Sequence, residues 1–246
     1  MKKLIVAFLL ALAPALGLAS GGGAHLDQAN IDLSDKASLQ SGAKYFVNYC
    51  LSCHSAKYQR LNRMAKDLGL TEEEVKNNLM FTTDKIGDGM TIAMPEDKAA
   101  KWFGNPPPDL SVIARARGVD WIYTYLRSFY VDESRPFGVN NTVFPEVGMP
   151  HVLWELQGMQ KAVHKLEKDS AGNEVEVFDH FELVKPGSLT PEQYDAVARD
   201  LTAFLSYIGE PIQMERQRLG LWVLLFIAVF FVLAYLLKKE YWKDVH

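Results

Sequence analysis

The chain has 246 residues, of which 48% are hydrophobic, a net charge of -4 and only two cysteines. Two uninterrupted apolar runs, at residues 4–19 and 219–237, flank a polar middle. This pattern excludes a protein with many membrane spans, a disordered chain and a small disulfide-held module. Residues 4–215 hold 19 basic and 28 acidic residues, a net charge of -9. Such a domain does not attract nucleic acid, but it can attract a basic protein partner.

A secretory signal peptide is predicted for residues 1–19. Two lysines precede an apolar run, and small residues then accumulate up to residue 24. A basic start, a short apolar core and a small-residue exit are typical of a segment that is removed on export. Cleavage after Ala19, or alternatively after Ala24, would leave a mature domain at residues 25–215 outside the cytoplasm. The alternative is an uncleaved amino-terminal anchor, for which the apolar core is short.

The two cysteines lie in the pattern Cys50-Leu-Ser-Cys53-His54, directly after a helix predicted over residues 36–49. One turn of chain brings both thiols to the two vinyl groups of a single haem, and the adjacent imidazole then reaches the iron. A thioredoxin-type redox pair would follow a strand instead. A zinc site would need two further ligands, and there is no third cysteine. The pattern therefore predicts covalently bound haem c with His54 as its proximal ligand.

The motif does not fix the ligand opposite His54. An electron carrier closes this position, often with methionine, whereas an oxygen sensor or a peroxidase leaves it open. Met149 lies in a loop that prolines stiffen and a glycine opens, while Met94 lies in a Lys/Asp-rich segment. We expect Met149 to be the ligand, ahead of Met94. The other downstream candidates are Met64, Met80, Met90, Met159, His151, His164 and His180.

Further helices are predicted along the middle of the chain. One begins at Thr71, where Glu74 completes a capping box, and two more cover residues 109–117 and 120–130. The clearest is Thr190–Ile208, which a proline opens and Gly209 ends. Between residues 161 and 185, alternating apolar residues and the turn sequence Ala-Gly-Asn predict a small β-hairpin.

The carboxy-terminal run Leu219–Leu237 contains no charged residue. At 1.5 Å per residue it extends for about 28 Å, close to the thickness of the bilayer core. Aromatic residues lie near both of its ends, as they do at membrane interfaces. A buried helix of a soluble domain would be expected to keep some polar face. Residues 216–238 are therefore predicted to form a single transmembrane anchor, followed by a short cytoplasmic tail at 239–246.

Several blocks of sequence together resemble one family. They are Cys50–His54, Pro106–Ser111, Ala114–Gly118, Gly148–Pro150, and a last helix that runs into a carboxy-terminal anchor. In this combination the chain resembles the cytochrome c1 family, the haem-bearing subunits of the cytochrome bc1 complex (ubiquinol–cytochrome c oxidoreductase). The first block occurs in every c-type cytochrome, but the combination is much narrower and spans nearly the whole mature chain.

The resemblance implies a role for six residues. Cys50 and Cys53 would attach the haem, His54 and Met149 would bind its iron, Arg117 would pair with a haem propionate, and Pro108 would pack against the haem. A buried propionate needs a charged partner, and a guanidinium is planar and always charged. Arg115, two residues earlier, cannot share a helix face with Arg117. The stretch 158–188 has no assigned counterpart, and no cysteine is left for the extra disulfide of some bacterial relatives.

The resemblance also implies a fold and a role. The fold would be mainly α, a c-type cytochrome haem domain with loop and hairpin insertions and one carboxy-terminal transmembrane helix. The chain, not an enzyme on its own, would pass one electron from the Rieske iron–sulfur subunit to a soluble or anchored cytochrome c, beside cytochrome b. It would cross the bacterial inner membrane once, with its haem domain in the periplasm. The alternatives are an anchored haem protein with an open sixth position, such as a gas sensor or peroxidase-like enzyme, and a free-standing cytochrome that feeds an oxidase.

Overall fold

Two helices from opposite ends of the sequence, α2 (Lys36–Tyr45) and α9 (Pro191–Gly209), form the centre of the fold. The computed structural model describes residues 25–168 and 172–244, so the predicted signal peptide lies outside the described residues. At the crossing of the two helices, a Cβ on Gly42 would lie 2.1 Å from the backbone oxygen of Asp200. The ring of Phe46 packs on that of Phe204 with centroids 5.5 Å apart. Glycine therefore permits a backbone approach that no other residue allows.

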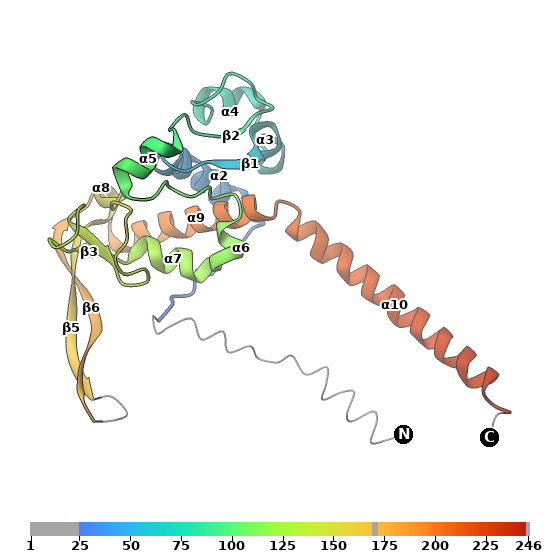
Figure 1. The fold of residues 1–246 in the computed structure, drawn as a ribbon. Coiled ribbons are helices and arrows are strands. Elements are labelled where there is room, and N and C mark those ends of the chain that lie inside the picture. Colours follow the sequence, from blue (N-terminus) through green and yellow to red (C-terminus); the bar gives the residue numbers. More distant parts are fainter. Residues whose placement is uncertain (1–24, 169–171, 245–246) are drawn as a thin grey trace.

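The remaining elements surround this pair (Figure 1). In chain order the other helices are the π-helical turn η1 (Phe46–Cys50), α3 (Leu61–Leu68), α4 (Glu72–Asn78), α5 (Glu96–Phe103), α6 (Ile113–Arg117), α7 (Val119–Arg127), α8 (Trp154–Gln157) and α10 (Gln213–Tyr241). The strands are β1 (Ala56–Arg60), β2 (Gly89–Met90), β3 (Phe129–Val131), β4 (Val139–Asn141), β5 (Gly158–Lys168) and β6 (Glu174–Pro186). They pair antiparallel as β1–β2, β3–β4 and β5–β6.

The structure confirms most of the predicted elements and shortens two of them. The capping boxes at Thr71 and Thr190 both form. The helix predicted over 109–117 begins only at Ile113, because the Asp109 carboxylate accepts hydrogen bonds from the N–H groups of Lys57 and Ser111 and holds the chain in a loop. The helix predicted over 120–130 ends at Arg127, and the next residues pair in β3.

The predicted hairpin is longer than its turn signal suggested. Strands β5 and β6 pair from Gly158 to Lys168, and Figure 1 shows them projecting from one end of the domain. An aromatic pair on one face, Phe178 and Phe181, has centroids 4.6 Å apart. On the other face Lys161 pairs with Glu182 at 2.7 Å. The aromatic pair lies within β6 and the ion pair joins β5 to β6, and together they stabilise a ribbon that has no third strand among the described residues.

An ordered amino-terminal arm is held against α7. The N–H of Asp27 bonds to Thr124 Oγ1 at 2.9 Å, and the N–H of Ala29, a fully buried residue, bonds to a carboxylate oxygen of α7 at 2.8 Å. Arg127 forms ion pairs with both Asp27 and Asp195 of α9. The arm from residue 27 onward is thus part of the domain, and both predicted cleavage sites precede it.

The anchor leaves the domain through a short stalk. Glu210, which follows α9, accepts hydrogen bonds from Arg216 in the first turn of α10 and lies 3.9 Å from Arg115 of α6. These cations lower the pKa of the Glu210 carboxyl. Helix α10 is 29 residues long, and among the described helices it is the one long and apolar enough to cross a membrane. It packs against nothing in the domain, and Figure 1 shows it leaving the end of α9 opposite the β5–β6 hairpin.

Candidate functional site

The haem-binding motif lies on a tightly closed turn at the end of α2. The N–H of Leu51 bonds back to the carbonyl of Phe46 in the π-helical turn η1, and the N–H groups of Cys53 and His54 both bond to the Cys50 carbonyl, at 3.0 and 2.8 Å. Both cysteines are free thiols, one buried and one half-buried. Burial, with a smaller contribution from Cys53, raises the pKa of the Cys50 thiol to about 12. A reactive dithiol pair needs a lowered thiol pKa, so this environment disfavours the redox-pair alternative.

His54 is oriented by a backbone carbonyl. Its Nδ1 lies 2.8 Å from the oxygen of Pro108. A carbonyl oxygen can only accept, so Nδ1 carries the proton and Nε2 keeps its lone pair. Burial lowers the pKa of His54, which favours this neutral form. None of the described residues forms a hydrogen bond with Nε2, which is therefore left available as a metal ligand.

The proline-rich segment is fixed beside the motif by polar contacts with the residues that directly follow His54. Leu110 donates its N–H to the Ser55 carbonyl at 2.7 Å, and Asp109 accepts from the N–H of Lys57 at 3.0 Å. Partial burial alone would raise the pKa of Asp109, but hydrogen bonds from Ser111 and Lys57 lower it overall. Pro108 itself is exposed and reaches the site through its backbone oxygen.

Arg117 is exposed and lies against two neighbouring aromatic rings. Its guanidinium is 5.1 Å from the centroid of Trp121 and 5.7 Å from that of Phe144. No carboxylate among the described residues pairs with it, whereas Arg115 turns toward Glu210 of the stalk. Arg115 and Arg117 therefore lie on different faces of α6, as expected for residues two positions apart on a helix. An arginine that is held by rings and lacks an anion is suited to receive one from a ligand.

Met149 lies in hydrogen-bond contact with α7. The hydroxyl of Tyr125 donates to the Met149 sulfur at 3.3 Å. The Tyr125 ring stacks on Trp121, with centroids 5.0 Å apart, and meets Phe129 edge to face at 5.1 Å. Burial raises the pKa of the Tyr125 hydroxyl, which therefore stays protonated. One run of aromatic contacts thus connects the arginine to the methionine.

Tyr125 also joins the two hydrophobic clusters of the domain. It packs against the main core, which contains Cys50, and against the smaller cluster of Phe129, Val139 and Val147, which includes Met149 at its edge. Met94 belongs to neither cluster. The N–H of Ile92, shortly before Met94, bonds to Ser55 Oγ at 3.1 Å, directly after His54. The segment of Met94 is therefore tied to the proximal motif.

The loop after Met149 is held by His151. This residue is buried, and its ring stacks in parallel on Phe129 with centroids 4.9 Å apart. Desolvation lowers the pKa of His151 to about 4, so the ring is neutral near pH 7. A neutral ring stacked on a buried phenylalanine anchors this loop to β3.

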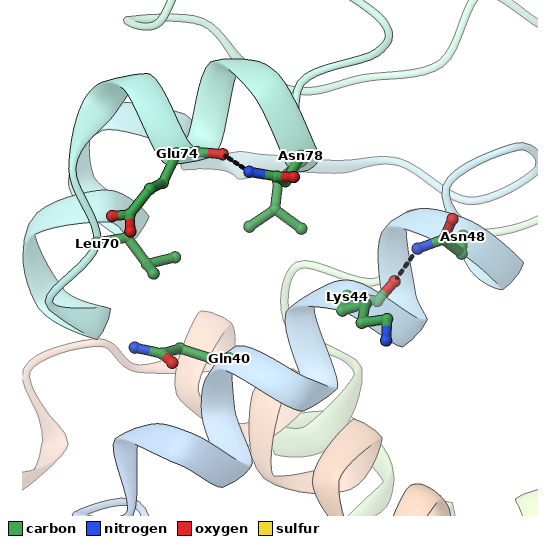
Figure 2. Close-up of a pocket in the computed structure, with 7 residues that line it drawn as sticks. Gln40, Lys44, Asn48, Leu70, Glu74 and Asn78 are labelled. Atoms are coloured by element: carbon green, nitrogen blue, oxygen red, sulfur yellow. Dashed lines mark hydrogen bonds between the residues drawn. The ribbon is translucent and has the colours of Figure 1, made fainter.

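A separate polar cavity of about 380 Å³ lies between α2 and α4 (Figure 2). Gln40 extends toward the Leu70 side of the cavity, and Lys44 lines it from the same helix. The lining residues include no cysteine, histidine or methionine, and two lining amides are engaged with their own helical turns, Asn48 with Lys44 and Asn78 with Glu74. This cavity is therefore distinct from the haem motif.

The chemistry of the predicted site residues fits a covalently bound haem. Two free thiols lie on one turn, an oriented imidazole keeps one nitrogen lone pair, and the thioether of Met149 is held by a hydrogen bond. The Arg117 cation has no carboxylate partner among the described residues. The aromatic residues at positions 121, 125 and 144 were not among the predicted site residues. The spacing of Trp121 and Tyr125 was a usable signal, since side chains four apart adjoin on a helix.

Comparison with known proteins identifies relatives along the whole chain. The sequence model of the Cytochrome C1 family matches residues 28–245. The chain is 57% identical to cytochrome c1 of Allochromatium vinosum over 246 residues, all of both chains. It is 49% identical to a protein of Nitrosomonas europaea named ammonia monooxygenase gamma subunit, over all of this chain and 98% of that protein. It is 28% identical to the mitochondrial cytochrome c1 heme protein of Saccharomyces cerevisiae, over 86% of this chain and 68% of that protein.

The predicted resemblance is thereby confirmed, and with it the predicted haem c and the electron-carrier role. The chain belongs to the cytochrome c1 family, the membrane-anchored, haem-bearing electron-transfer subunits of the cytochrome bc1 complex, which are not catalytic on their own.

Proposed function

We propose that this chain is the one-electron relay between a Rieske iron–sulfur subunit and a cytochrome c, with a defined set of residues around one haem. Cys50 and Cys53 form the thioether bonds, and His54 and Met149 bind the iron. Arg117 pairs with a propionate, and Pro108 holds the proximal face. When bound, the haem would supply a one-electron redox centre, and His54 and Met149 would each give its iron one ligand, so that no position would be left for a substrate.

The observation that carries this proposal is the hydrogen bond between His54 Nδ1 and the Pro108 oxygen at 2.8 Å. Metal-bound histidines almost always donate their second ring N–H in this way, which fixes the tautomer and raises the basicity of the ligating nitrogen. The contact therefore supports a proximal role for His54 beyond the motif itself.

Two observations favour Met149 over Met94 as the distal ligand. A distal ligand must approach from the side opposite His54, and the segment of Met94 is tied to Ser55 beside the motif. Met149 is instead held by α7 through Tyr125. Met149→Leu is expected to abolish the far-red sulfur-to-iron charge-transfer band of the oxidised protein, and Met94→Leu is the matched control. Retention of the band in Met149→Leu and its loss in the control would assign the ligand to Met94.

The proposed setting is the outer face of a bacterial inner membrane. Removal of residues 1–19, or of residues up to 24, would leave the domain 25–215 in the periplasm. Residues 216–238 would span the bilayer, with residues 239–246 in the cytoplasm. Cytochrome b and the Rieske subunit are the proposed neighbours within the membrane complex. The charge of -9 on residues 4–215 would speed encounter with a basic cytochrome c. An electron-delivery rate that does not fall with ionic strength would overturn that last point.

The central experiment is a reduced-minus-oxidised spectrum of the purified chain together with a haem-stained gel. A covalent c-type haem at the mature mass is expected. Rapid, stoichiometric binding of carbon monoxide by the reduced protein would instead indicate an open sixth position, as in a gas sensor or peroxidase-like enzyme.

Purification in mild detergent tests the assembly. Co-isolation with b-type haem and an iron–sulfur protein is expected. Isolation without partners would point to a free-standing cytochrome that feeds an oxidase. Co-isolation with monooxygenase subunits would favour the role named for the Nitrosomonas europaea relative.

A further inference from the structure

The hydroxyl of Tyr125 is aimed at the sulfur of Met149 by a rigid aromatic setting. The oxygen-to-sulfur distance is 3.3 Å. The ring is stacked on Trp121 on one side and is met edge to face by Phe129. The Tyr125 backbone oxygen accepts a hydrogen bond from Asn141 Nδ2 at 2.8 Å, which ties this turn of α7 to β4. With the ring and the backbone both fixed, the hydroxyl has little freedom to turn toward another acceptor.

A thioether sulfur has two lone pairs, so it can bind iron with one and accept a hydrogen bond with the other. Sulfur that is bound to oxidised iron donates more of its electron density to the metal, which makes it a poorer acceptor. Sulfur that is bound to reduced iron keeps more density and is a better acceptor. A donor at this position therefore stabilises the reduced state more than the oxidised state.

We propose that Tyr125 is a positioning and tuning residue, whose hydrogen bond to Met149 raises the reduction potential of the haem and fixes the orientation of the axial sulfur. This inference rests on the proposed assignment of Met149 as the distal ligand. The tuned event is the gain of one electron by the iron, with no bond made or broken. Trp121, which lies between Arg117 and Tyr125, keeps the donor in place.

The test is Tyr125→Phe in the full-length, haem-loaded protein, because it removes only the hydroxyl and keeps both ring contacts. An ordinary protein hydrogen bond is worth about a factor of five in an equilibrium constant. Only the difference in the strength of this bond between the two redox states shifts the equilibrium, so the ratio of reduced to oxidised haem at a fixed ambient potential is expected to fall by up to about fivefold. At about 59 mV per tenfold for one electron, this corresponds to a potential lower by up to about 40 mV.

The matched control is Tyr207→Phe. Tyr207 is also a buried tyrosine, and its hydroxyl donates to Asp67 Oδ2 at 2.9 Å. It reports the effect of losing a buried tyrosine hydroxyl on overall stability, and its potential is expected to equal that of the native protein. A shift of the same size in both variants would overturn a specific role for Tyr125.

The far-red sulfur-to-iron band separates failure of this inference from failure of the ligand assignment. If the native protein and Tyr125→Phe both keep the band, an unchanged or raised potential in the variant overturns the tuning role and leaves Met149 as the ligand. If the native protein lacks the band, the ligand assignment fails and the tuning role fails with it. A band that persists with an altered energy in Tyr125→Phe, together with the lower potential, supports the proposal.

Discussion

Replacement of Gly42 by alanine is expected to destabilise the domain, although alanine is the better helix former. The added Cβ would lie 2.1 Å from the Asp200 backbone oxygen and 2.7 Å from Phe204 Cβ. Unstrained carbon contacts lie near 3.5–4.0 Å, so α2 and α9 must separate by roughly 1 Å or more. Overpacking of this kind lowers the free energy of unfolding by about 1–3 kcal/mol. The upper value applies here because the nearest atom belongs to the backbone of α9, which cannot move aside as a flexible side chain can.

The gain in helix propensity, about 1 kcal/mol, offsets part of this cost. The net loss is then about 2 kcal/mol, which for a domain of this size lowers the melting temperature by roughly 4–8 °C. The assay is thermal unfolding of the haem-loaded protein in mild detergent, with the loss of helix monitored by circular dichroism.

The matched control is Gly209→Ala at the end of α9. There a new Cβ would meet only Arg115 Cγ at 3.5 Å and the Ser111 oxygen at 3.7 Å, which are ordinary contacts. An unchanged or slightly raised melting temperature is expected in this variant. If Gly42→Ala melts at or above the temperature of the native protein, the close approach of the two helices is wrong, and so is the reasoning built on it.

Three further substitutions test other contacts. Arg127→Gln leaves two partly exposed carboxylates without their cation and is expected to cost about 2 kcal/mol in thermal unfolding, with earlier proteolysis of the amino-terminal arm. Hydrogen bonds from the backbone and hydroxyl of Thr71 lower the folded-state pKa of Glu74 below its ordinary 4.5. The ionised Glu74 side chain therefore stabilises the fold fully above pH 4.5, and this stabilisation is lost as the pH falls through the lower folded-state pKa. The gap in melting temperature between native protein and Glu74→Gln should therefore close in acid; a gap that persists there would contradict this assignment. Arg117→Gln should lower the reduction potential by removing a cation near the iron, whereas Arg115→Gln should leave it unchanged; equal shifts would contradict the propionate assignment.

The features that were predicted correctly depend on residues that are close together in the sequence. The haem motif spans five positions, and the helix from Pro191 is framed by its own cap, proline and terminal glycine, so no distant contact is needed to find either one. The charge-free run of α10 can likewise be predicted from its own length and composition.

The features that escaped prediction depend on partners far along the chain. Strand β1 forms because Ala56 meets Met90, and strand β3 forms because Phe129 meets Asn141. Neither short segment alternates for long enough to indicate a strand by itself. The contact of Tyr125 with Met149 joins residues 24 positions apart, and its value depends on a loop conformation that the sequence pattern does not specify.

The ion-paired stalk at Glu210 has a mechanical consequence. Arg216 of the anchor and Arg115 of the haem domain both contact the Glu210 carboxylate. The angle between the anchor helix and the domain is therefore restrained at Glu210. Under the proposed function, these ion pairs would limit how far the haem domain can tilt relative to the anchor. Electron transfer weakens steeply with distance, so a limited tilt would keep the distance between the haem and the proposed membrane partners within a narrow range.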